Sequence, residues 1–166
     1  GLALQMKEGG ADAKTLVQDS WTLVEKDIDA TGVKFFMRIF TIAPEALQLF
    51  SFKDAKDLEK SPALAKHAGE VMRTVGTAVA GLNDVETLLP VLRSLGGSHS
   101  AYGVVPEHFP IVGEALLWTL EEGLTPAGVW TPEVKEAWTQ TWGTVVSAME
   151  PALIEENKKA AAAAKK

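Results

Sequence analysis

The sequence predicts an all-α fold, and three observations support this prediction. Apolar residues recur three or four positions apart along most of the chain, which is the spacing of one face of an α-helix. We find no alternating run of β-branched residues bounded by a hairpin turn, so we expect no sheet. Prolines and glycines divide the chain into segments of unequal length, which favours an irregular helical fold over an up-and-down bundle.

The first sixty residues predict two helices and a short helical turn. Apolar stripes run through residues 16–24 and 33–40. The second helix must end near Pro44, because the residue before a proline disfavours helical backbone angles. A helical turn is expected at residues 47–50, before a polar connection that is rich in lysine and aspartate.

The middle of the chain predicts two further helices. Ser61 and Pro62 form a helix start, with a capping hydroxyl followed by proline at the first helical position. An apolar stripe follows at residues 64–79, and residues 81–84 form a break. A second stripe covers residues 88–102, and we expect its continuous helix to begin at Pro90, because proline is tolerated in the first turn.

The last third of the chain predicts two more helices. Pro106 and Glu107 are expected to open the first of them, which runs through Leu120 and ends at the break formed by residues 123–128. Residues 131–133, Thr-Pro-Glu, are the clearest start signal in the chain, since they combine a capping hydroxyl, a proline and an acid that the helix dipole favours. The final helix runs through Met149 and is expected to pass Pro151 with a kink.

A chain of 166 residues fits a single domain. We assign residues 1–11 to an N-terminal extension, residues 12–154 to the domain and residues 155–166 to a charged, alanine-rich tail. The only basic cluster of the chain lies in that tail. We expect the tail to be frayed or helical.

Composition excludes several classes of function. The chain has no cysteine, which removes disulfides, thiolate catalysis, iron–sulfur clusters and thiolate zinc sites. A net charge of −6 argues against nucleic acid as a partner. No stretch approaches the roughly 18 apolar residues of a membrane span, and no secretory signal or glycine-rich phosphate loop is recognisable, so we expect a cytoplasmic protein with no membrane partner.

Two of the three histidines, His67 and His99, lie inside apolar stripes on different predicted helices. Each one alone is most often a hydrogen-bonded core residue, whereas two on neighbouring faces can share a partner such as haem iron. Zinc would need about three protein ligands, and the only nearby acid is Glu70, without a second histidine at helical spacing. His108 follows a helix start, and we expect it at a helix end or on the surface.

Several segments of the chain resemble globins. Residues 34–44 and 49–52 are similar to the second and third globin helices, and Ser61-Pro62 followed by His67 resembles the start of the distal helix. Residues 95–99 with 102–104 resemble the proximal stretch, and residues 130–138 the opening of the last helix. The resemblance covers roughly residues 12 to 150. It is strongest with neuroglobin-like (nerve haemoglobin-like) and non-symbiotic plant globins.

This resemblance implies a globin fold, a three-over-three helical sandwich around one haem b. It makes His99 the proximal iron ligand, and it makes His67 the distal histidine and a candidate sixth ligand. The remaining expected haem contacts are Phe36 above the distal pocket, Phe50 wedged against the haem, Val71 in the distal pocket, and Leu95, Val104 and Phe109 on the proximal side.

The resemblance also implies reversible binding of dioxygen, with carbon monoxide and nitric oxide as related ligands. We expect an oxygen store or carrier, a monomer or weak homodimer with no catalytic residues, rather than an enzyme. Two alternatives stay open: a nitric oxide dioxygenase or nitrite reductase, and a gas sensor in which both histidines bind the iron. No reductase or output domain is recognisable, which favours binding. The chain departs from vertebrate neuroglobins at Glu70, where they carry lysine, and at Trp142, where they carry tyrosine.

Overall fold

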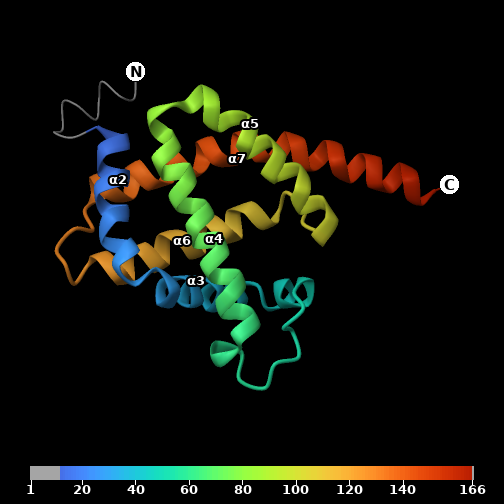
Figure 1. Cartoon of the computed structure of the whole chain (residues 1–166), viewed down its shortest axis with the longest axis horizontal. Helices are drawn as coiled ribbons and strands as arrows, with labels where there is room; N and C mark the ends of the chain where they lie inside the picture. The colour runs from blue at the N-terminus through green and yellow to red at the C-terminus, as the bar shows by residue number, and fades with distance from the viewer. Residues whose placement is uncertain (1–11, 166) are drawn as a thin grey trace.

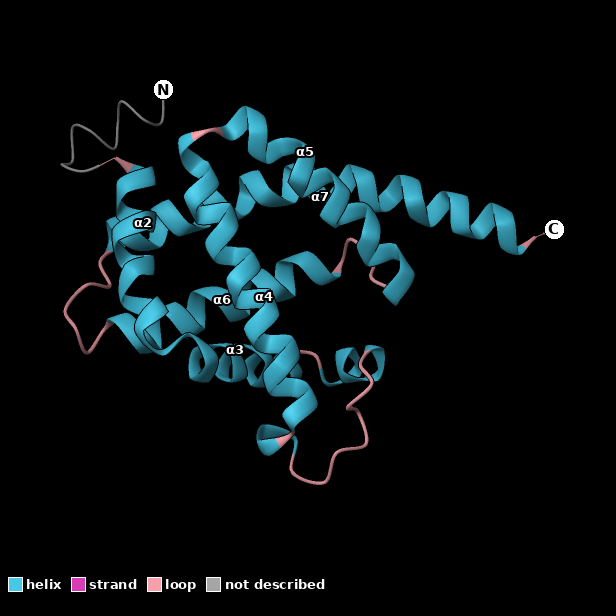
Figure 2. Ribbon diagram, viewed as in Figure 1, coloured by secondary structure: helices cyan, strands magenta, loops and turns pink. Residues whose placement is uncertain are grey.

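The computed structural model describes residues 12–165, and within that range it contains helices and no strand (Figures 1 and 2). The predicted all-α class is confirmed. The predicted N-terminal extension, residues 1–11, lies outside the described residues. The α-helices are α2 (Ala13–Val24), α3 (Ile28–Ile42), α4 (Pro62–Ala80), α5 (Val85–Ser98), α6 (His108–Leu124) and α7 (Pro132–Ala164). Short 3₁₀-helices, which connect or flank them, are η1 (Glu25–Asp27), η2 (Pro44–Leu49), η3 (Leu58–Lys60), η4 (Gly81–Asn83) and η5 (His99–Tyr102).

Side-chain caps fix the two helix starts that the sequence marks most clearly. The Ser61 hydroxyl accepts a hydrogen bond from the amide of Leu64 at 3.3 Å. The Thr131 hydroxyl accepts one from the amide of Val134 at 3.2 Å. Each bond satisfies an amide that has no partner inside its own helix. The predicted starts of α4 and α7 are therefore confirmed.

Helix α5 begins five residues before the predicted start, so the prediction that its continuous helix begins at Pro90 is wrong. Asp84 caps the helix instead, because its carboxylate accepts from the amide of Thr87 at 3.3 Å and from the Thr87 hydroxyl at 2.6 Å. Pro90 inside the helix removes the hydrogen bond to the carbonyl of Glu86. Both residues are exposed, so water can bind that carbonyl.

The last helix continues into the predicted tail, which the sequence allowed to be either frayed or helical. Helix α7 continues through Pro151 and ends at Ala164, so residues 155–164 of the predicted tail are helical. In Figure 1 this part of α7 extends beyond the other helices. Within the described residues no helix is both long and apolar enough to cross a membrane.

The core has two parts. The first cluster consists of buried apolar residues from α2, α3, η2, α4, α6 and the first turns of α7. The second cluster joins α5, the start of α6 and the later turns of α7 through Leu88, Leu92, Phe109, Ala148, Met149 and Leu153. Helix α4 crosses α3 closely at Gly32, where a Cβ atom would lie 2.9 Å from Met72 Cγ.

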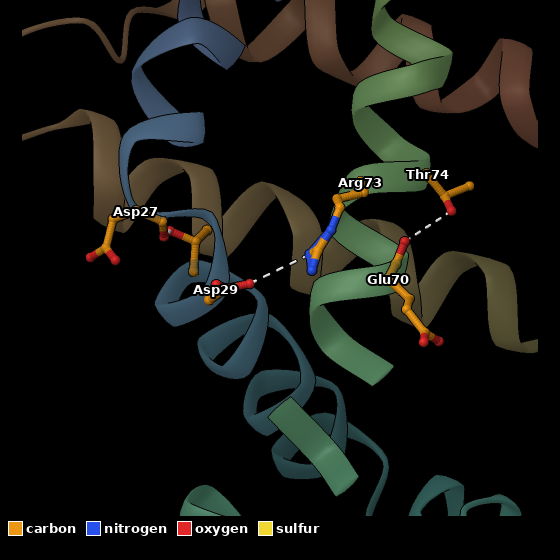
Figure 3. Close-up of polar contacts among 6 residues, drawn as sticks. Asp27, Asp29, Glu70, Arg73 and Thr74 are labelled. Atoms are coloured by element: carbon orange, nitrogen blue, oxygen red, sulfur yellow. Dashed lines mark hydrogen bonds and ion pairs between the residues drawn. The ribbon is translucent and has the colours of Figure 1, made fainter. Parts of the chain in front are cut away.

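One ion pair connects α3 and α4 across the surface. Arg73 lies 3.6 Å from the carboxylate of Asp29, and Figure 3 shows the two side chains pointing toward each other from their helices. Their side chains are 62% and 76% exposed. Water and salt screen such a pair strongly, so it contributes little to the packing of these helices.

A buried hydrogen bond connects the first and last helices. The indole of Trp138 donates to the Ser20 hydroxyl at 2.9 Å, and both residues are buried. We expect Ser20→Ala to lower the free energy of unfolding by about 1–3 kcal/mol, because the buried indole N–H loses its acceptor. Equilibrium unfolding in urea measures this. The control is Thr22→Ala on the exposed side of α2, with an expected change within about 0.5 kcal/mol. Equal stability of the two variants would contradict the prediction.

Candidate functional site

His99 lies at the junction between α5 and η5, and its ring orientation is fixed by its own helix. The ring Nδ1 lies 2.6 Å from the carbonyl oxygen of Leu95, one turn earlier. A carbonyl oxygen only accepts hydrogen bonds, so Nδ1 is the atom that carries the proton. In the neutral ring the other nitrogen, Nε2, therefore keeps a lone pair. This is the arrangement in which a histidine binds a metal through Nε2 while a carbonyl orients it.

His67 lies on α4 among aromatic side chains. Its ring centroid is 5.2 Å from that of Phe36, 5.3 Å from that of Phe50 and 6.4 Å from that of Phe52. The Phe36 and Phe50 rings meet it at steep angles, 71° and 64°, as favourable aromatic contacts do. The prediction assigned roles to Phe36 and Phe50, and the structure places both against His67.

Phe52 is a contact of this site to which the sequence interpretation gave no role. It is buried, and its ring stacks on Phe50 with centroids 5.1 Å apart. A signal was present, because two phenylalanines separated by one residue follow the η2 turn. In a segment without regular secondary structure, however, spacing alone does not determine where a side chain points.

Burial lowers the pKa of His67 below its ordinary value of 6.5. The nearby Glu70 carboxylate opposes this lowering of the pKa, and a smaller electrostatic effect of His99 adds to it. The ring of His67 is therefore neutral at neutral pH, with one nitrogen that donates and one that accepts.

The other predicted contacts fall on the two sides of the site. Val71, one helical turn after His67, is partly buried and packs against the first cluster. Leu95 and Val104 are partly buried against the second cluster, in which Phe109 is fully buried. The residues predicted as distal thus share the first cluster, and those predicted as proximal share the second. Their roles toward a cofactor stay predictions.

The donor set fits haem better than a free metal ion. One imidazole, His99, is oriented through Nδ1, and the other, His67, lies among aromatic side chains. Haem sites use histidine as an iron ligand in this way. A zinc site needs about three or more protein ligands. Residues 12–165 contain no group of three or more histidine or acidic side chains able to hold a metal ion.

Glu70 is exposed on α4, one residue before Val71. Figure 3 shows its side chain directed away from Arg73, while its backbone carbonyl accepts a hydrogen bond from Thr74 at 2.9 Å. Within residues 12–165 it forms no ion pair. His108, the remaining histidine, is the first residue of α6, and its Nδ1 accepts from the amide of Val105 at 3.1 Å. Its predicted place at a helix end is confirmed.

Comparisons with known proteins agree with this geometry. A protein-family model described as Globin matches residues 33–149, a range that contains both histidines and all the predicted contacts. Neuroglobin from Danio rerio is 38% identical over 140 residues, which cover 82% of this chain and 87% of the relative.

Proposed function

This chain belongs to the globin family, and from that premise we propose that it is an oxygen store or carrier that binds dioxygen reversibly. The cofactor we propose is one haem b, held through Nε2 of His99. The hydrogen bond between His99 Nδ1 and the Leu95 carbonyl carries the proposal, because it directs the unprotonated Nε2 toward a ligand. Membership of the family supports haem and small gases as ligands, and dioxygen is our choice among those gases.

Haem held by His99 would supply an iron centre that binds a small gas. The residues of the chain define the environment of that centre. The Leu95 carbonyl holds the His99 ring in one orientation. The aromatic rings of Phe36, Phe50 and Phe52 exclude water from the side on which His67 lies. Exclusion of water and a fixed ring favour reversible binding over oxidation.

His67 is the polar side chain that we propose to meet the gas. Its lowered pKa keeps the ring neutral, and within residues 12–165 no hydrogen bond to the ring is present. A free N–H of His67 is therefore available to donate to dioxygen, and its other nitrogen is available as a sixth ligand when gas is absent. We propose that it does both, so that a gas must first displace it, which lowers the observed affinity.

We propose reversible binding rather than turnover of nitric oxide or nitrite. Reduction of nitrite consumes protons, which a second acid beside the bound nitrite would have to deliver. Glu70 acts on His67 through charge, and it forms no hydrogen bond with the ring in the described structure. This arrangement favours a binding protein over an enzyme.

The absorption spectrum of the haem-loaded chain, reduced with dithionite under argon, tests the proposal. We expect a Soret band and two sharp visible bands, which indicate that both histidines bind the iron. Dioxygen should then bind and be released without loss of the ferrous state. Absence of a Soret band after reconstitution with haem would refute the proposal. Rapid oxidation under air would favour turnover or sensing over storage.

Replacing His67 by leucine should change that spectrum and the release of dioxygen. We expect one broad visible band in place of two, and release about tenfold faster, because a hydrogen bond to a charged partner contributes about 1.5–3 kcal/mol. Absorption spectroscopy and stopped-flow mixing measure the two effects. The control is Lys66→Leu at the exposed neighbouring position of α4. Identical spectra and rates in both variants would show that His67 does not face the gas.

A further inference from the structure

Helix α7 reaches the segment that follows His99. The helix packs along α5 (Figure 1), and its part beyond residue 154 was predicted to be a tail outside the domain. Asn157 lies in this part and is partly buried. Two side-chain hydrogen bonds connect it to residues more than fifty positions earlier in the chain.

The two hydrogen bonds hold both ends of one short segment, residues 100–104. The Ser100 hydroxyl donates to Asn157 Oδ1 at 2.5 Å. Asn157 Nδ2 donates to the backbone carbonyl of Val104 at 3.1 Å. A single amide side chain thus binds the residue directly after His99 and the residue directly after Gly103, the C-cap of η5. The Ser100 hydroxyl needs an acceptor and the Val104 carbonyl needs a donor. An amide side chain at position 157 supplies both, one through its oxygen and one through its nitrogen.

Residues 100–104 depend on the two Asn157 hydrogen bonds because few backbone hydrogen bonds hold this segment. Gly103 adopts a left-handed conformation with φ of 78°, which terminates η5. Its amide donates to the Ser100 carbonyl at 3.1 Å, whereas the amide of Val104 reaches the His99 carbonyl only at 3.4 Å. The second of these is long for a hydrogen bond. Asn157 adds a tertiary restraint where the local ones are weakest.

We propose that Asn157 is a positioning residue for the proximal side of the haem site. It holds Ser100 and Val104, so that His99 keeps its orientation and Val104 keeps its place against the second cluster. The proposal rests on the proposed function, since His99 is taken as the iron ligand. It also makes the end of α7 a part of the haem-binding domain.

Two variants separate the hydrogen bonds. Asn157→Ala removes both, and Asn157→Asp keeps the acceptor for Ser100 but replaces the amide N–H that donates to Val104. The control is Lys158→Ala, at the exposed next residue. Measured on the haem-loaded full chain, we expect both Asn157 variants to release haem about three- to tenfold faster than the unmodified chain. This is less than the roughly 10–100-fold effect of a group that bonds a metal ligand directly, because Asn157 acts on His99 through Ser100 and Val104. The control should match the unmodified chain.

Two further readouts separate positioning from a general loss of stability. Resonance Raman spectroscopy should show a shifted iron–histidine stretching frequency in both Asn157 variants, measured in the five-coordinate His67→Leu background. Amide hydrogen exchange should become faster at Gly103 and Val104 without a matching change in α2 or α3. Faster exchange throughout the chain, with an unshifted frequency, would overturn the proposal. Equal haem release and equal hydrogen exchange in Asn157→Ala and Lys158→Ala would also overturn the proposal.

The hydrogen-exchange readout does not depend on haem. If the unmodified chain takes up no haem, the proposed function fails on its own. In that case exchange at Gly103 and Val104 in the haem-free chain still decides whether Asn157 holds the segment. Unchanged exchange there would overturn the positioning role as well.

Discussion

His99→Gly is expected to abolish stable haem binding, with an affinity at least about 100-fold below that of the unmodified chain. The replacement removes the imidazole whose Nδ1 lies 2.6 Å from the Leu95 carbonyl oxygen and whose Nε2 is the proposed iron ligand. Even residues that only orient a metal ligand contribute about 10–100-fold to affinity, so loss of the ligand itself should cost more. Titration with haem, followed at the Soret band, measures the effect.

Added imidazole provides the critical control for this variant. It should enter the space left by the His99 side chain and restore part of the Soret intensity, because it supplies the missing nitrogen. His108→Gly, at the start of α6, should leave haem affinity unchanged. A His99→Gly chain that keeps the original affinity and spectrum would show that another residue supplies the axial bond.

Gly96→Ala is expected to destabilise the chain strongly, because this glycine is the place where α5 lies against the backbone of α7. A Cβ atom at position 96 would lie 2.6 Å from Met149 Cα, 2.8 Å from its carbonyl carbon and still closer to its carbonyl oxygen. Backbone atoms cannot rotate away as a side chain can. The two helices must therefore separate, and we expect the free energy of unfolding to fall by about 3 kcal/mol. Urea unfolding measures this change.

Gly143→Ala is the matched control for Gly96→Ala. Gly143 lies inside α7, and a Cβ atom there would meet no atom within 4 Å. Because alanine has a higher helix propensity than glycine, this variant should be about 0.5–1 kcal/mol more stable than the unmodified chain. If both variants were stabilised equally, the close approach of α5 and α7 at Gly96 would be wrong. Gly96 lies three residues before His99, so its replacement should also weaken haem binding.

Local signals in the sequence predicted the helices well. The hydroxyls of Ser61 and Thr131 cap amides three residues later, and both starts follow from the sequence. The predicted start of α5 at Pro90 was wrong because the Asp84 carboxylate caps the helix earlier, and a helix can continue through an exposed proline. The end of α7 was left open, because a basic, alanine-rich segment is compatible with either a frayed end or a helix, and the structure shows a helix to Ala164.

Sequence patterns single out the two histidines of the candidate site but not all of the side chains that contact them. His67 and His99 stand out in the sequence because each interrupts an apolar stripe with an imidazole. The resemblance to globins then gave each a role, and the structure placed Phe36 and Phe50 against His67. Neither Phe52 nor Asn157 was assigned a role, because their contacts depend on a loop and on a helix end that local patterns do not place.

The sequence by itself determined the helical class, most helix boundaries and the pair of histidines, because these depend on interactions within about four residues of the chain. Tertiary structure alone decided which distant groups meet. The Trp138 indole forms a hydrogen bond with Ser20, which is 118 positions away in the sequence, and Asn157 forms one with Ser100, which is 57 positions away. The close fit of α5 on α7 at Gly96 is of the same kind. Such contacts arise only when helices pack, since the relative position of two helix faces depends on the whole core rather than on either segment.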